Sequence, residues 1–161
     1  MNTLQEFLKQ RADHIRDTFP ERVRVQNEWI QAVEKLINQL KAWLTAADPQ
    51  NILEFFEDTI QRRESDVGVY LVKRLVIRLE AQEVQVVPIA RMVIGPVTTS
   101  GSTHTGRSYG RVDMTNGVSK FLLFRTQVEP SDRWIIVDED AYVPRDLDRD
   151  TFDAAMQSLL Q

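Results

Sequence analysis

Residues 20–47 read PERVRVQNEWIQAVEKLINQLKAWLTAA and carry the strongest structural signal in the chain. Their branched aliphatic residues recur in steps of three, four or seven positions, which is the period of an α-helix with one apolar face. The residues on this face are Val23, Ile30, Val33, Ile37, Leu40 and Leu44. No glycine occurs before Gly68. The pattern therefore predicts a helix over about 20–46 that packs against another element.

A further row on the same helix holds Trp29, Leu36 and Trp43, so the apolar face is three rows wide. A two-stranded coiled coil needs only two such rows. We therefore expect packing within the chain, with oligomerisation through this face as the alternative. The three residues of the extra row are the candidate partner-binding residues.

The segment before residue 20 also has helical spacing, through Leu4, Phe7, Leu8 and Ile15. It predicts a first helix over about 2–17. Thr18-Phe19-Pro20-Glu21 then resembles a break and a restart, with Thr18 as the cap and Glu21 three residues later, as in a capping box. Residues 1–47 are therefore expected to form a helical pair.

The chain after Asp48-Pro49 changes to the alternating pattern of β-strands, with a helix at its end over about 150–160, capped by Asp150 or Thr151. Residues 52–64 fit either a helix or a strand, and a strand is favoured. Pro88 indicates an edge strand or a bulge, and Asn116-Gly117 a hairpin turn. The expected strands are 52–64, 69–80, 84–94, 108–115, 118–128 and 133–138.

Helices followed by a run of strands indicate an α+β fold rather than a parallel α/β fold. The 161 residues are expected to form one α+β domain. It consists of a helical pair over 1–47, an antiparallel meander sheet of five or six strands within 48–149, and a terminal helix over 150–161. The side of 69–80 that holds Val69, Leu71, Leu75 and Ile77 is the expected buried side.

Composition and charge exclude several classes of function. The chain has no cysteine, which removes disulfides and thiolate zinc sites. Residues 138–153 hold seven acids and two arginines, so they contribute −5 to the net charge of −4 and the rest sums to +1. A nearly neutral body with an acidic segment argues against nucleic-acid binding, which depends on neutralising phosphates. With no signal pattern and no long apolar run, a cytoplasmic protein without membrane contact is expected.

Residues 101–108 read GSTHTGRS and match the phosphate-loop pattern except that Arg107 replaces lysine. That motif requires a following helix, and residues 109–115 are predicted to be a strand, so nucleotide hydrolysis is rejected. A solvated loop is the favoured interpretation of this stretch. Binding of an anion by His104, Arg107 and Arg111, with loop N–H groups, is the alternative.

Residues 146–153 resemble a calcium loop, but Thr151 stands where glycine is required and Gln157 where a glutamate is required. Acids gathered at a helix N-terminus explain this stretch better. No serine has the setting of a nucleophile elbow, and no metal or catalytic site is predicted. The sequence indicates no cofactor and leans against an enzyme.

The function hypothesis from the sequence is a non-catalytic protein-interaction or assembly component. It acts through its N-terminal helices on a protein partner or on further copies of itself. The alternative is a domain that binds an anionic small molecule through the 97–108 loop and arginines of the strands.

Overall fold

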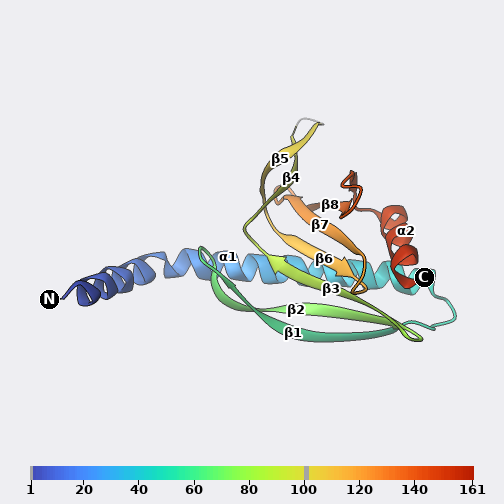
Figure 1. The fold of residues 1–161 in the computed structure, drawn as a ribbon, viewed down its shortest axis with the longest axis horizontal. Helices are drawn as coiled ribbons and strands as arrows, with labels where there is room; N and C mark the ends of the chain where they lie inside the picture. Colours follow the sequence, from blue (N-terminus) through green and yellow to red (C-terminus); the bar gives the residue numbers. More distant parts are fainter. Residues whose placement is uncertain (1, 100–101) are drawn as a thin grey trace.

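The computed structural model describes residues 2–99 and 102–161, which form two helices and nine strands (Figure 1). In chain order these are α1 (Thr3–Ala47), β1 (Glu54–Glu64), β2 (Gly68–Leu79), β3 (Gln82–Ala90), β4 (Val93–Thr99), β5 (Ser102–Ser108), β6 (Arg111–Thr115), β7 (Lys120–Gln127), β8 (Arg133–Asp138), β9 (Pro144–Asp146) and α2 (Arg149–Leu160). A long N-terminal helix, a large antiparallel sheet and a C-terminal helix confirm the α+β class.

Seven strands form one antiparallel sheet in the order β1-β2-β3-β6-β7-β8-β9. This is a meander interrupted once, because β4 and β5 leave it after β3 and form a separate two-stranded hairpin. The hairpin rises away from the sheet in Figure 1, while α1 runs along it. Pro88 lies beside a register shift between β3 and β6, which confirms the predicted bulge.

The main core lies between the sheet and the two helices. Val86 on β3, Met114 on β6 and Leu123 on β7 point toward the helices and are buried. Val33, Ile37 and Leu40 of α1 and Phe152, Met156 and Leu159 of α2 cover them. The periodicity of residues 20–47 thus correctly predicted the packed side of α1 over its C-terminal half.

The opposite face of the sheet has a smaller core of Leu122, Phe124, Ile135 and Val137. The hairpin of β4 and β5 approaches it closely at one point. A Cβ atom added at Gly95 would lie 2.5 Å from Cε1 of Phe124, so glycine is required for this approach. The hairpin therefore depends on the sheet for its position.

The predicted helical pair is wrong, because α1 continues through Pro20 as one helix of 45 residues. Thr18 does not cap a new helix. Its hydroxyl donates to the carbonyl of His14 at 2.8 Å, within the same helix. Proline removes one helical hydrogen bond and is a common cause of bending, and the dark blue N-terminal part of α1 runs at an angle to the rest in Figure 1. The carbonyl of Arg16 loses its helical partner, because Pro20 has no N–H. Both residues are exposed, so water can bind this carbonyl.

The strand prediction needs three further corrections. The sheet has seven strands, not five or six, because β9 is only three residues long and carries no alternating pattern. Residues 93–99 and 102–108 are the two strands of the hairpin, although a solvated loop was expected over 101–108. In β2, Val69 and Leu71 are exposed and Tyr70 and Val72 are buried instead, so the buried side changes phase before Leu75 and Ile77.

The C-terminal helix is confirmed, with a different cap. Asp148 rather than Asp150 or Thr151 is the N-cap residue, and its carboxylate accepts from the backbone N–H of Thr151 at 2.9 Å. The Thr151 hydroxyl accepts in return from the N–H of Asp148 at 3.0 Å. These two bonds form a capping box, so Asp148 of the acidic run has a structural role at the start of α2.

Candidate functional site

The N-terminal half of α1 extends beyond the sheet (Figure 1). It carries an uncovered row of large apolar side chains. We call this row the exposed seam. Its members are between 51 and 63% exposed, and they are Leu4, Phe7, Leu8, Ile15 and Phe19. Scattered exposed apolar residues are normal on proteins, whereas five of them along one helix face form a patch that needs an explanation.

The exposed seam continues the side of α1 that packs on the sheet. An α-helix completes five turns in 18 residues, so residues 18 apart point in the same direction. Ile15 is therefore aligned with Val33, and Phe19 with Ile37, both of which are completely buried. One helix face thus packs on the core in its C-terminal half, and in its N-terminal half no other described residue covers it.

The boundary between the two halves lies near Gln26. Its side-chain amide donates to the carbonyl of Val67, in the turn between β1 and β2, at 2.7 Å. Trp29, one turn later, is the first completely buried residue of α1. The body of the protein therefore begins to cover α1 between residues 26 and 29.

A buried charge cluster attaches α1 to the sheet at this boundary. The side chain of Arg125 on β7 is only 3% exposed and makes an ion pair with Glu28 of α1. Its Nη2 and Nε lie 2.7 and 2.9 Å from the carboxylate of Asp132. Arg91 approaches Glu28 from the other side, with Nε 3.2 Å from Oε2. Removing one member of such a cluster leaves an uncompensated buried charge, so the cluster fixes α1 on the sheet.

The carboxylate of Glu64, at the end of β1, binds the connection between β3 and β4. It accepts from the backbone N–H groups of Arg91 and Met92 at 3.0 Å, and from the hydroxyl of Tyr70. Burial raises the pKa of Tyr70, and the neighbouring Glu64 carboxylate raises it further. Tyr70 therefore stays neutral and acts as a hydrogen-bond donor.

The pKa of Glu28 reflects two opposing effects. Burial acts to raise it, and the contacts with Arg125 and Arg91 together outweigh burial and hold it below 4.5. Glu28 is therefore charged at neutral pH, as its role between two arginines requires.

Trp29, one of the predicted partner-binding residues, is completely buried. Its ring lies 6.1 Å from that of Trp134 on β8, and an added Cβ at Gly110 would come within 2.1 Å of it. In this structure Trp29 fills the core beside the charge cluster and has no surface to present to a partner.

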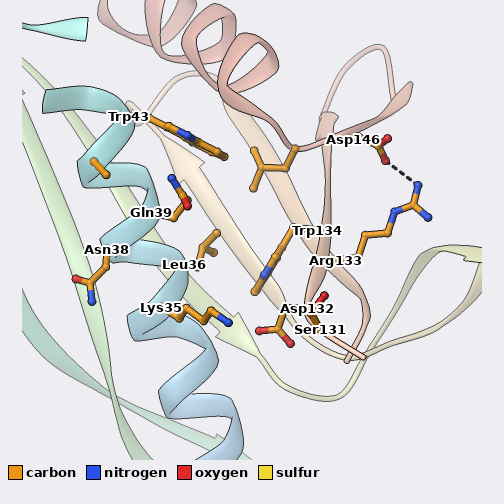
Figure 2. A pocket seen from close by; sticks show the side chains of 12 residues that line it. Lys35, Leu36, Asn38, Gln39, Trp43, Ser131, Asp132, Arg133, Trp134 and Asp146 are labelled. Carbon is orange, nitrogen blue, oxygen red and sulfur yellow. Dashed lines mark hydrogen bonds and ion pairs between the residues drawn. The ribbon is translucent and has the colours of Figure 1, made fainter. Parts of the chain in front are cut away.

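The other two predicted partner-binding residues, Leu36 and Trp43, line a groove of about 810 Å³ between α1 and the β8–β9 edge of the sheet. Figure 2 shows Trp43 and Trp134 on its two walls. Lys35, Gln39 and Asp132 give it polar groups, and an ion pair of 3.0 Å joins Arg133 to Asp146 at its rim. The sequence did not single out Trp134, because its place opposite α1 depends on long-range strand order.

The predicted anion-binding residues lie on the hairpin and on β6. The His104 side chain is outside the described residues. Arg107 is exposed on β5, opposite Ile94 of β4. Arg111 lies on β6, and its guanidinium donates to both carboxylate oxygens of Asp113 at 2.7 and 2.9 Å. The hydrogen bond to Asp113 raises the pKa of Arg111 against the opposing effect of burial, so this charge is already compensated.

Among residues 2–99 and 102–161, no group of three or more histidine, aspartate or glutamate side chains is arranged to hold a metal ion. Within the same residues, neither helix combines the length and apolar character needed to cross a membrane. Comparison with protein-family models, curated proteins and solved structures finds no match for this chain.

Proposed function

We propose that this protein is an assembly component that binds another protein chain through the N-terminal half of α1. The observation that carries the proposal is the exposed seam, aligned with the buried side of the same helix. A partner that covers it extends the helix packing already present over residues 29–44.

Five large apolar side chains, each at least half exposed, can contribute about 1 kcal/mol each when a partner covers them. Association costs several kcal/mol in lost freedom of motion, so the seam supports a specific complex of moderate affinity. Most helical stability in proteins comes from tertiary packing, so a partner that packs on this segment also stabilises its helical conformation.

The anion-binding alternative has weaker support. Arg111 is held by Asp113, and Arg107 lies exposed on the separate hairpin rather than in the groove. The groove beside Trp43 contains both acids and bases, which gives no preference for an anionic small molecule.

Site-specific photo-crosslinking in living cells tests the proposal, because it links the seam covalently to whichever chain covers it. A photoreactive amino acid replaces Ile15 in one variant and Val69 in another. Val69 is the matched control, because it is also 51% exposed but lies on β2. We expect a discrete protein adduct from position 15 and none from position 69. Equal adducts from both positions, or none from position 15, would refute the proposal.

A further inference from the structure

We infer that the occupant of the exposed seam is a second copy of this chain, with the two α1 helices packed antiparallel about a twofold axis near residues 13 and 14. The inference rests on the proposed function and names its partner. It also fixes which residues face each other across the interface.

The exposed seam is self-complementary in one antiparallel register. In that register, the residue numbers of two residues that face each other add up to 27. Leu8 therefore faces Phe19 of the partner subunit, and Ala12 faces Ile15 of the partner subunit. Leu4 faces Val23 in the same way. Each large residue near the axis thus meets a residue of suitable size, and the small Ala12 leaves room for isoleucine. Leu8, Ala12, Ile15 and Phe19 also have the four- and three-residue steps of a coiled-coil core.

The position of the sheet disfavours a parallel pair. The side of α1 that carries Ile15 is the side that Val33 presents to the chain's own sheet. Paired helices lie about 8–10 Å apart. In a parallel pair, both sheets would have to lie between the two helices beyond residue 29. The helices are only about 8–10 Å apart, and two stacked sheets alone need about 10 Å. An antiparallel pair places the two bodies at opposite ends.

The length of the uncovered segment fits the same arrangement. Residues 4–23 span roughly 30 Å of helix, and the partner's helix begins opposite Val23. The chain's own body begins at Gln26, through its hydrogen bond with Val67. The partner's helix therefore covers residues 4–23 of this chain. Its N-terminus lies next to the turn between β1 and β2.

The charges beside the seam oppose pairing only weakly. Arg11 and Arg16 are the nearest like charges across the axis in this register. Arg16 is paired with Asp13 at 2.7 Å and lies 4.0 Å from Asp17, and all three are exposed to solvent. Exposed, solvent-screened charges of this kind contribute little, less than the gain from covering the seam.

Disulfide trapping in the full-length chain tests the register, because the protein has no cysteine of its own. Two variants, Leu8→Cys and Phe19→Cys, are oxidised mildly, each alone and as a mixture. Both positions are exposed in one chain, so the substitutions spare the fold. We expect a rapid disulfide between the two variants in the mixture and little in either alone. Val69→Cys mixed with Leu8→Cys measures random collision.

The outcomes separate this inference from the proposed function. Rapid self-linking of Leu8→Cys, or a mixture no faster than the collision control, overturns the antiparallel dimer. If position 15 still gives a photo-adduct with a different protein, the proposed function stands and only the second copy is wrong. If position 15 gives no adduct at all, both are wrong.

Discussion

The guanidinium of Arg125 on β7 is paired with the carboxylate of Glu28 on α1, and this contact joins the helix to the sheet where the helix leaves the body. Arg125 also binds Asp132, so one buried cation compensates two acids. Arg125→Met keeps much of the side-chain volume and removes the charge. We expect a loss of about 3–5 kcal/mol in the free energy of unfolding, because Asp132 loses its cation and Glu28 loses one of its two. Urea denaturation measures it.

Arg74→Met is the control for that experiment. Arg74 pairs with Asp58 at the surface of β1 and β2, where both side chains are partly exposed. A loss below about 1 kcal/mol is expected from this variant. Equal losses from the two substitutions would show that the charge cluster has no special role in attaching α1.

The pH dependence of stability gives a second test of the cluster. The pKa of Glu28 is lower in the folded protein than the ordinary 4.5. Its charge therefore stabilises the fold above pH 4.5, and this contribution is lost as the pH falls through the lower, folded pKa. Glu28→Gln lacks the contribution. We expect the gap in unfolding free energy between wild type and variant to narrow as the solution is acidified, and a gap independent of pH contradicts the assignment.

Gly110 tests the packing of Trp29. Its φ of +148° is unfavourable for other residues, and an added Cβ would lie 2.1 and 2.4 Å from two atoms of the indole. Gly110→Ala is expected to cost about 3 kcal/mol or more, through overpacking and backbone strain together. Thermal unfolding and the near-ultraviolet circular dichroism of tryptophan report the change.

Gly117→Ala separates the two causes. Gly117 also has a positive φ, of +90°, but no atom lies within 4 Å of an added Cβ. Backbone strain alone, about 1 kcal/mol, is expected there. If the two alanine variants lose the same stability, the close approach of Trp29 to Gly110 adds no cost, and the overpacking explanation is wrong.

The sequence predicted the packed side of α1 and most strands of the sheet, because both depend on local periodicity. Val33, Ile37 and Leu40 are buried as their spacing requires, and β8 has the predicted bounds of 133 to 138. The predicted helix break at Pro20 is wrong, because α1 tolerates a proline on its exposed stretch. That one error hid the exposed seam, because Leu8 and Ile15 were expected to pack within a helical pair.

The charge cluster and the groove could not be predicted from spacing. Glu28 and Arg125 are 97 positions apart, and only the order of strands in the sheet places β7 and β8 beside α1. Trp134 likewise reaches Trp29 through the register of β7 and β8. Such contacts depend on topology, for which the sequence carries no local pattern.

Light scattering of the purified protein over a range of concentrations tests the central claim most directly, namely that a second chain covers the exposed seam. The comparison uses Ile15→Ser/Phe19→Ser and the matched control Val69→Ser/Leu71→Ser, whose residues are likewise 51 and 60% exposed. We predict that wild type and control reach twice the mass of one chain, while Ile15→Ser/Phe19→Ser stays at the mass of one. A wild-type mass of one chain at every concentration, or a dimer that survives loss of the seam, would contradict the claim.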